Sequence, residues 1–521
     1  MKRFLVLALA AIAFAACAEK SEENGLVQNG EMEQSYVAVT LAADDLNSRA
    51  DDGKYEEGRA EERKVESAYV FFFKDGAAFP VTDDGTTSTN TGSKNYLPVA
   101  LTGSTSGMDN VSDIKDAVLI LKNYKGEYPN QIVAVLNWDP TAQSSYSLEN
   151  LKTKIANLGN DTTGYVMSNA VYANKAKQTV DAVALSIDNI GKTEAAALAN
   201  PVKIYVERVA AKVVFTAKDN GKFAVEKEIE GKPIYAQIKG FELYNDYQES
   251  WLIKRIDPTW DGLGFNWNDA DWFRSYWAQS LGKAFDENTF AWTTENTAIG
   301  GYVYCGENTR DWTTADVRTK VVVKAQLVDA DDAPVEVVNW YGKDYIGEDT
   351  LKNVVANTLK SVYFTSADAT TFTGLTPDDI KCVDRLVTDA KAYEVYFQLS
   401  DAGKAKTWYQ YVGGQYTAID VDALNTALAE VQPALVYNDG MTYYWLDIKH
   451  LGAAGSTAEY GIVRNHVYKV NITDITGYGT PVYDGTSDFI NLEKPEDIVT
   501  YVSAQINILS WRLVENDYNL N

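Results

Sequence analysis

The sequence has few of the residues that most enzymes use for chemistry. It holds three cysteines and two histidines among 521 residues. Three cysteines exclude a disulfide scaffold, although one bridge between Cys305 and Cys382 is arithmetically possible and two separate free thiols are the alternative. Neither His450 nor His466 has a partner at metal-ligand spacing. We therefore interpret both histidines as packing or hydrogen-bonding residues.

Motifs for catalysis and for cofactor binding are also missing. The string Gly103-Ser-Thr-Ser-Gly107 has threonine where a nucleophile elbow needs serine. Gly262-Leu-Gly264 lacks the third glycine of a dinucleotide site, and Asp329-Ala-Asp331-Asp332 lacks the spacing of a calcium loop. We predict no catalytic residues, no metal and no cofactor. One enzymatic alternative stays open, because a pair among the 73 acidic residues would suffice for glycoside hydrolysis.

Positive charge is scarce as well. The chain carries 47 lysines and arginines against 73 acidic residues, a formal net charge of −26. Such a chain repels phosphate backbones, so nucleic-acid binding is excluded. The acidity suits an exposed protein that must stay soluble.

The only long apolar run lies at the start. Lys2 and Arg3 precede the apolar stretch Phe4 to Ala16, which is too short to span a bilayer and is typical of an export signal. Small residues directly before Cys17 resemble a bacterial lipobox, so we predict a signal peptide over residues 1–16 and acylation of Cys17. A plain signal peptide with a chance cysteine is the alternative.

The rest of the chain predicts a mostly β protein. Short apolar or alternating segments, separated by turn-rich loops and without a repeating β-α unit, favour antiparallel β-sandwiches with long loops and a few short helices. A chain of this length needs at least two cores. The Lys/Glu/Gly-rich segment 218–232 is the predicted boundary, which gives an N-terminal β-sandwich domain over 50–228 and a C-terminal one over 229–521.

Two alternating strands near the chain ends stand out. The first has Val37, Val39, Leu41 and Ala43 on one face. The second lies in residues 498–514, with Val502, Ala504, Ile506 and Ile508 on one face and a change of phase after Ile508 that predicts a bulge or bend. An apolar strand at a chain end needs a groove. It is either the closing strand of its own sheet or a donor strand that pairs with another molecule.

A charged segment follows the first strand. Residues 44–64 carry Arg49, Arg59 and Arg63 among acids and glycines, and little in it can pack a core. We expect an exposed loop that a protease can reach.

Several phrases, in order along residues 35 to 515, resemble the type V pilus fimbrillins, in particular the short-fimbria (Mfa-type) major subunits. They are Ile132-Val-Ala-Val-Leu-Asn137, Tyr165-Val-Met-Ser-Asn169, Val206-Glu-Arg-Val-Ala-Ala-Lys-Val213, Arg274-Ser-Tyr-Trp-Ala278, Tyr304-Cys-Gly-Glu-Asn308, Val321-Val-Val-Lys-Ala325 and Val463-Arg-Asn-His-Val-Tyr-Lys-Val470.

This resemblance implies how the chain is processed. In that family a lipoprotein signal precedes a first strand that an arginine-specific protease removes before assembly. Asn47-Ser-Arg49-Ala50 looks like that cleavage site, and Arg59 and Arg63 are its competitors. Residues 17–49 are then an acylated tether and removable first strand, anchored in the outer membrane by palmitate-type lipid before cleavage.

The resemblance also implies a function. We expect a structural shaft subunit of a cell-surface fimbria that supports adhesion, is not an enzyme, and polymerises head to tail with copies of itself by strand exchange. Anchor and tip fimbrial subunits are further expected partners. The alternative is a surface lipoprotein that does not polymerise and binds host protein or glycan. Asp161-Thr162-Thr163 and Asp349-Thr350-Leu351 resemble an O-glycosylation sequon.

Overall fold

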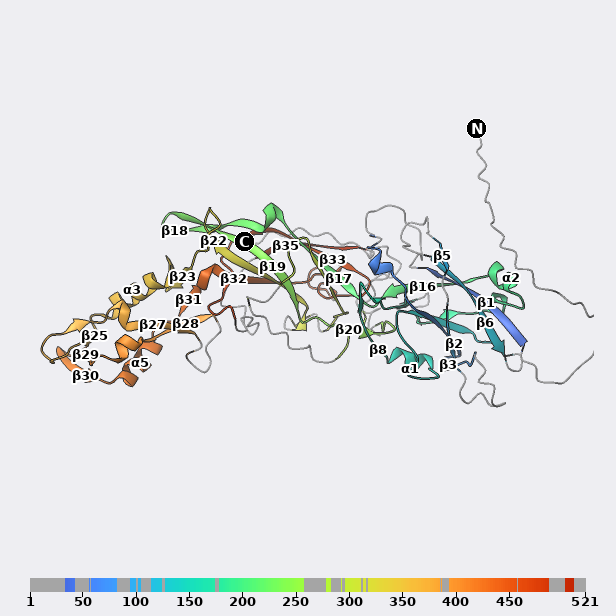
Figure 1. Ribbon diagram of the computed structural model, residues 1–521, viewed down its shortest axis with the longest axis horizontal. Coiled ribbons are helices and arrows are strands. Elements are labelled where there is room, and N and C mark those ends of the chain that lie inside the picture. The colour runs from blue at the N-terminus through green and yellow to red at the C-terminus, as the bar shows by residue number, and fades with distance from the viewer. Residues whose placement is uncertain are drawn as a thin grey trace, which may run out of the picture.

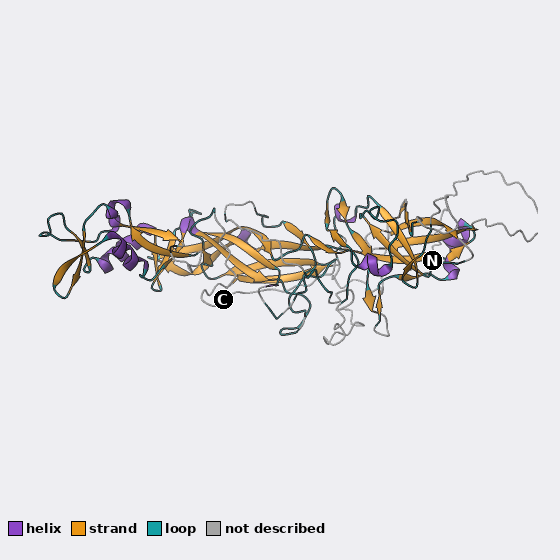
Figure 2. Ribbon diagram, turned by 90° about the horizontal axis from the view of Figure 1, so that it is seen from below, coloured by secondary structure: helices purple, strands orange, loops and turns teal. Residues whose placement is uncertain are grey.

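The computed structural model describes residues 33–42, 56, 58–81, 94–99, 102–104, 114–123, 127–173, 178–256, 278–282, 292, 296–310, 313–314, 317–384, 386, 393–456, 458–486 and 502–509. The molecule is elongated, and its strands form three groups along the long axis (Figure 1). Figure 2, seen at right angles, shows that strands dominate and that the helices are short. The predicted mostly β fold is confirmed.

The N-terminal group is built on one large sheet. Its main path runs β3-β2-β7-β11-β16-β1-β6-β5, and β4, β14 and β15 pair beside it. The strands are β1 (Glu33–Ala42), β2 (Ala68–Lys74), β3 (Ala77–Ala78), β4 (Tyr96–Pro98), β5 (Thr102–Ser104), β6 (Ile114–Asn123), β7 (Gln131–Leu136), β11 (Met167–Asn169), β14 (Val183–Ala184), β15 (Ile190–Gly191) and β16 (Val202–Arg208).

Short elements surround this sheet. They are η1 (Glu61–Arg63), α1 (Leu148–Lys152), β8 (Ile155–Asn157), β9 (Gly159–Asn160), β10 (Gly164–Tyr165), β12 (Tyr172–Ala173), β13 (Thr179–Val180), η2 (Ile187–Asn189) and α2 (Glu194–Ala199). Ser147 caps α1 by accepting a hydrogen bond from the backbone N–H of Asn150.

Strands β2 and β7 of the large sheet are buried on both faces. Successive side chains of a strand point to opposite faces, and β2 therefore places Phe71 in one core and Phe72 in another. Neither phenylalanine is exposed to solvent. This explains why β2 and β7 are continuous apolar runs in the sequence rather than alternating ones.

The middle group consists of two sheets that face each other. One has the order β21-β17-β33-β35 and the other β18-β19-β22-β32-β34. Phe215 and Phe241 stack between them, with ring centroids 4.7 Å apart. The elements are β17 (Ala211–Ala217), η3 (Lys218–Gly221), β18 (Lys222–Ile229), β19 (Lys232–Tyr244), β20 (Glu249–Trp251), which pairs with β8, β21 (Tyr302–Cys305), β22 (Lys320–Val328), η7 (Asn438–Gly440), β32 (Met441–Asp447), β33 (Val467–Ile475), β34 (Thr480–Pro481) and β35 (Val502–Leu509).

A third group lies at the far end of the molecule from the N-terminal sheet (Figure 1). The chain enters it after β22 and leaves it before β32, and we call residues 337–437 the distal unit. Its elements are β23 (Val337–Trp340), β24 (Lys343–Ile346), α3 (Glu348–Leu359), β25 (Tyr363–Thr365), β26 (Thr373–Gly374), η6 (Pro377–Asp379), β27 (Ile380–Asp384), β28 (Glu394–Leu399), α4 (Asp401–Lys404), β29 (Trp408–Val412), β30 (Gln415–Ile419), α5 (Val421–Ala429) and β31 (Ala434–Tyr437).

The distal unit has a core of its own. Leu351 and Val355 of α3 and Leu424 of α5 pack against Val395 and Phe397 of β28, and all five are fully buried. The sequence analysis did not separate this unit from the predicted C-terminal sandwich. The division of the chain into domains at 228 and 229 stays a prediction.

The chain passes from the N-terminal sheet to the middle group before the predicted boundary at residue 228. β16 ends at Arg208 in the N-terminal sheet, whereas β17 begins at Ala211 and pairs with β21 and β33 of the middle group. Only the buried residues Val209 and Ala210 separate the two strands, so the N-terminal and middle groups are joined by a very short connection.

Candidate functional site

The first strand lies in the middle of the N-terminal sheet. β1 pairs along its whole length with β6 in antiparallel register, with Val37 opposite Leu119 and Val39 opposite Ala117. On its other side it pairs with β16 in parallel register and with β15 in antiparallel register. A strand in this position supplies hydrogen bonds to two neighbours, so its departure would leave two unpaired edges.

The side chains of β1 fill the core of this sheet. Val37, Ala38 and Val39 are almost completely buried, and Val37 and Val39 belong to a core that includes Val202 and Ile204 of β16. Helix α2 contacts β1. Of the other predicted first-strand residues, Leu41 pairs with Lys115 and Ile204, and Ala43 lies outside the described residues.

The predicted donor strand lies at the edge of a middle sheet. β35 pairs with β33, with Val502 opposite Ile475, Ile506 opposite Val470 and Ile508 opposite Tyr468. Ala504 lies where the register shifts, because β33 carries one extra residue there. The stretch after Leu509, where the sequence predicts a change of phase, lies outside the described residues. Within the described residues β35 has a neighbour in its sheet on one side only.

The segment after the first strand is anchored rather than free. The Nη2 atom of Arg59 donates hydrogen bonds of 2.8 and 2.9 Å to the carboxylate of Asp161, and its guanidinium lies 4.6 Å from the ring centroid of Tyr302. Glu62 of η1 is completely buried. The expectation of an exposed loop over residues 44–64 is wrong for this part, because the charged side chains have partners in the two neighbouring groups. Arg49 and Ala50, like residues 1–17, lie outside the described residues.

Glu62 is the centre of this contact. Its Oε1 accepts a hydrogen bond from Nζ of Lys212 at 2.6 Å, and the hydroxyl of Tyr304 donates to the same oxygen. Its backbone carbonyl accepts from Nε of Arg208 at 2.7 Å. Burial alone would raise the pKa of Glu62, but these hydrogen bonds and the charge of Lys212 lower it to about 2. We call Arg59, Glu62, Asp161, Lys212 and Tyr304 the clamp.

The clamp bridges two groups of strands. Asp161 lies between β9 and β10 of the N-terminal group, whereas Lys212 and Tyr304 belong to β17 and β21 of the middle group. Glu56, just before it, pairs with Lys469 of β33 at 3.2 Å. Glu56, Arg59 and Glu62 therefore hold the N-terminal and middle groups together on the C-terminal side of Arg49.

Other phrases of the resemblance meet at the same junction. Nε of Arg464 donates to Glu307 at 3.0 Å, and its Nη2 donates to the backbone carbonyl of Trp251 at 2.7 Å. Nζ of Lys254 lies 3.7 Å from Oε2 of Glu207. Arg464, Glu307, Lys254 and Glu207 are all buried, and burial raises the pKa of Glu207 against the attraction of Lys254 and Arg464. Phrases far apart in the sequence thus form one buried ionic junction.

Both histidines contact hydrogen-bonding partners inside the fold, and Cys305 and Cys382 do not form a disulfide. Nδ1 of His450 lies 3.0 Å from the hydroxyl of Tyr468, and Nδ1 of His466 lies 2.7 Å from the carbonyl of Arg464, so both are packing and hydrogen-bonding residues as predicted. Cys305 and Cys382 are free thiols. The described residues contain no cluster of metal-ligating side chains and no helix long and apolar enough to cross a bilayer.

One family model matches the C-terminal part of the chain. Residues 435–517 match the family described as major fimbrial subunit protein type IV, fimbrillin, C-terminal. The predicted resemblance to the fimbrillins is confirmed. It supports a structural fimbrial subunit at the cell surface. The matched segment includes β32 and β33, together with the donor-strand candidate β35.

No curated protein matches the chain. Among solved structures, a fimbrilin (fimA) from Porphyromonas gingivalis aligns with a TM-score of 0.38 and 13% identity, covering 92% of this chain and 98% of its own. A putative cell adhesion protein from Parabacteroides distasonis aligns at 0.36 and 13%, covering 91% and 96%. The tip fimbrial protein Mfa3 from Porphyromonas gingivalis aligns at 0.29 and 12%, covering 92% and 100%.

Sequence reasoning missed the clamp. Lys212 lies inside a quoted phrase, and a lysine between buried strand residues is a signal for a buried ion pair. Glu62 gave no signal, because one more acid in an acidic loop is unremarkable in composition. Asp161 was noted only as part of a glycosylation sequon.

Proposed function

We propose that this chain is the shaft subunit of a fimbria, exported as a lipoprotein acylated on Cys17, cleaved after Arg49, and polymerised when the tail of one subunit replaces the first strand of the next. The observation that carries the proposal is the place of β1. It is a central strand of the N-terminal sheet and is hydrogen-bonded to its neighbours. Its covalent connection to the following strands of that sheet runs through the segment that holds the predicted cleavage site.

Removal of β1 leaves a slot of defined chemistry. Two edges lose their ladder, and the pockets of Val37 and Val39 open toward residues such as Leu119 and Val202. Each fully buried valine contributes about 1.5–3 kcal/mol, and each ladder hydrogen bond about 1 kcal/mol. The cleaved subunit therefore needs another apolar strand to complete its fold.

The tail of a second subunit meets this need. Val502, Ala504, Ile506 and Ile508 alternate with the same period as Val37, Val39, Leu41 and Ala43. In its own molecule β35 has one paired edge within the described residues, whereas the slot between β6 and β16 offers two. In the exchange the tail strand gains a second row of backbone hydrogen bonds, and the exchange is favourable for that reason.

The head-to-tail geometry sets the product. The slot lies in the N-terminal group and the tail lies in the middle group, so the donating and accepting surfaces differ. A contact between different surfaces propagates into an open chain unless its rotation closes a ring. Anchor and tip subunits then terminate the fibre, and an arginine-specific protease starts its growth.

The clamp favours Arg49 over its competitors. Cleavage after Arg59 or Arg63 would cut within or just beyond the residues that tie the two groups together, whereas cleavage after Arg49 leaves Glu56, Arg59 and Glu62 in place. Arg63 is also part of the helical turn η1, and proteases bind their substrates in extended form.

N-terminal sequencing of protein extracted from the cell surface tests this proposal. Assembled fibres should begin at Ala50, and the precursor should carry lipid on Cys17. A surface form that keeps residues 17–49 and remains monomeric would contradict it and would favour the alternative, a lipoprotein that binds without polymerising.

A further inference from the structure

The distal unit ends in a β-hairpin whose outer strand has an open edge. β30 closes the four-stranded sheet β26-β25-β29-β30, and among the described residues it pairs with β29 alone. Gln415 to Ala418 are exposed, and Ile419 is half-buried. The outer edge of a sheet presents backbone N–H and C=O groups with which another strand can pair.

The hairpin turn determines which backbone groups of β30 face its neighbour. Gly413 and Gly414 have φ angles of 60° and 84°, as the two central residues of a type I′ turn require. The residues that flank this two-residue turn, Val412 and Gln415, therefore form a hydrogen-bonded pair. Along an antiparallel pair of strands, such pairs alternate with pairs whose backbone groups point away from each other.

The backbone groups of Tyr416 and Ala418 face the open edge. Tyr416 is opposite Tyr411, one step from the hydrogen-bonded pair at the turn. The N–H of Tyr411 donates away from β30, to the carbonyl of Val362 at 2.8 Å, as this alternation requires. Ala418 is two residues further along and has the same orientation as Tyr416. β30 thus offers two N–H and two C=O groups to a partner strand.

Other edge strands of the molecule carry protection that β30 lacks. β18 has lysines, glutamates and a shift in register, β24 has Lys343 and Asp344, and β27 has Lys381 and Asp384. Charged side chains and bulges on an edge strand prevent pairing with another chain. β30 reads Gln-Tyr-Thr-Ala-Ile, with no charge, no proline and no shift in its register.

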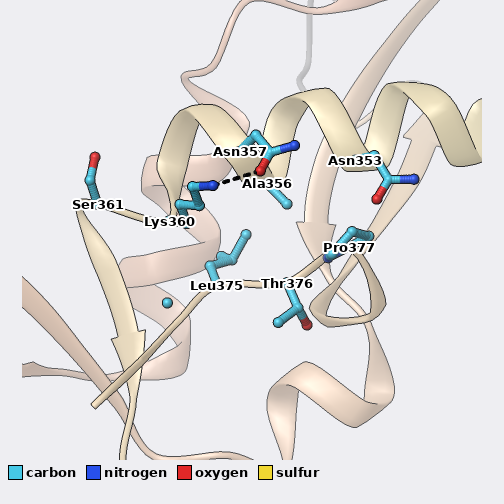
Figure 3. Close-up of a pocket in the computed structure, with 9 residues that line it drawn as sticks. Asn353, Ala356, Asn357, Lys360, Ser361, Leu375, Thr376 and Pro377 are labelled. Carbon is cyan, nitrogen blue, oxygen red and sulfur yellow. Dashed lines mark hydrogen bonds between the residues drawn. The ribbon is translucent and has the colours of Figure 1, made fainter.

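The opposite edge of the same sheet lies against a helix. β26 has two residues, and a Cβ at Gly374 would be 2.5 Å from the carbonyl oxygen of Lys360 at the end of α3. Figure 3 shows that Leu375, Thr376 and Pro377 then run beside α3, with Leu375 pointing toward the helix. The two edges of this sheet therefore differ, and β30 is the one with room for a further strand.

The distribution of charge favours a second copy of the chain as the partner. The chain carries −26, so two copies repel each other over most of their surfaces. Residues 407–419 hold no charged side chain. Two copies that meet along β30 therefore place no like charges opposite each other within the strands.

β30 is also complementary to itself. In an antiparallel pair centred on Thr417, Tyr416 of each copy is opposite Ala418 of the other, so every outward N–H and C=O group of both strands is paired. A large side chain then lies beside a small one in both pairs. Asp420, the first charged residue after the strand, would be opposite Gly414, which keeps the two carboxylates at opposite ends of the contact.

We propose that the open edge of β30 pairs with β30 of a second copy, in antiparallel register centred on Thr417. The contact joins identical surfaces about a two-fold axis. It needs no strand exchange and does not rest on the proposed function. In a fibre, it would link neighbouring fibres side by side, and many weak pairs would add along their length.

Disulfide trapping of the full chain tests the register. In the proposed pair the two copies of residue 417 have Cα atoms about 4.5 Å apart, within the range of a disulfide, whereas the two copies of residue 415 are more than about 10 Å apart. Thr417→Cys should therefore form disulfide-linked dimers at least about tenfold faster than Gln415→Cys, because pairing raises the effective concentration of the thiols. Both positions are exposed and lie on the same face of β30. The unaltered chain measures the background from the native cysteines.

Substitution of Ala418 in the Thr417→Cys chain tests the role of the backbone. Ala418→Pro removes an outward N–H that β29 does not use, and it should slow dimer formation by about tenfold or more. Ala418→Lys, which places a charge on the edge, should have the same effect. Ala418→Ser keeps the N–H and should leave the rate unchanged. Thermal melting identifies the variants that are folded.

Two outcomes overturn the proposal. Equal rates for Thr417→Cys and Gln415→Cys would show that the thiols meet by random collision. A rate for Thr417→Cys that neither Ala418→Pro nor Ala418→Lys lowers, with at least one of them folded, would show that the edge of β30 is not the contact. Neither measurement requires fibres, so a failure of strand exchange would not alter the result.

Discussion

The Nζ atom of Lys212 lies 2.6 Å from Oε1 of Glu62, and both side chains are almost excluded from solvent. This ion pair joins the segment that follows the first strand to a strand of the middle group. In the proposed processing, cleavage after Arg49 would leave this ion pair in the subunit, where it would keep the retained N-terminal segment in place.

Replacing Glu62 by Gln should destabilise the chain. The variant leaves Lys212 buried without a counter-charge, which typically costs about 3–5 kcal/mol. Urea unfolding at pH 7 measures the effect. Glu61→Gln, at a neighbouring side chain that is 49% exposed, should change the unfolding free energy by less than about 0.5 kcal/mol. The double variant Glu62→Leu with Lys212→Met should be more stable than Glu62→Gln, and a less stable double variant would contradict this view of the pair.

The contribution of Glu62 should depend on pH. Its folded pKa of about 2 lies below the ordinary 4.5. A lowered carboxyl pKa stabilises the fold fully above pH 4.5, and this stabilisation is lost as the pH falls from 4.5 to 2. The shift corresponds to about 3 kcal/mol. The difference in unfolding free energy between the unaltered chain and Glu62→Gln should shrink by about that amount between pH 6 and pH 2, and a constant difference would refute it.

Processing should distinguish Arg49 from Arg59. Arg49→Ala should accumulate a lipid-bearing precursor, because the predicted scissile bond is lost. Arg59→Ala should still be cleaved, but its melting temperature should fall, because Asp161 loses two hydrogen bonds. Mass spectrometry of the surface protein reads out both variants. A precursor that accumulates with Arg59→Ala and not with Arg49→Ala would move the site to Arg59.

Charged residues in the tail should block the polymer. In the variant Ile506→Asp with Ile508→Asp, two carboxylates would have to enter an apolar slot, at a cost of several kcal/mol. We expect a folded monomer that forms no fibres by electron microscopy. A matched variant, Gln505→Asp with Asn507→Asp, alters the opposite face of the same strand and should polymerise better. Normal fibres from the isoleucine variant would exclude the exchange.

The sequence predicted elements whose signal is local. Residues 421–429 form α5 as expected, and the run at 131–136 forms the buried strand β7. The helical spacing over 148–158 was half right: α1 ends at Lys152, and β8 follows at Ile155 because it pairs with β20, a strand almost a hundred residues away. Tertiary pairing overrode the local pattern there.

Long-range features were harder to predict. The strands of the distal unit resemble those around them in composition, so no local signal marks them as a separate core. The clamp joins Glu62 to residues about 150 and 242 positions further along, and no periodic pattern encodes such contacts. The two terminal strands were predictable because unbroken apolar alternation near a chain end is uncommon.

The chain enters and leaves the distal unit at adjacent points, since Gln326 of β22 is opposite Met441 of β32. Deletion of the unit would therefore leave an ordinary hairpin, and an unrelated module with close termini would fit in its place. In a fibre every copy would display that module at regular intervals. The two sheets of the middle group thus carry the distal unit without depending on it. In the proposed fibre, the distal unit could change in sequence and in what it binds while the strands that assemble the subunits stay the same.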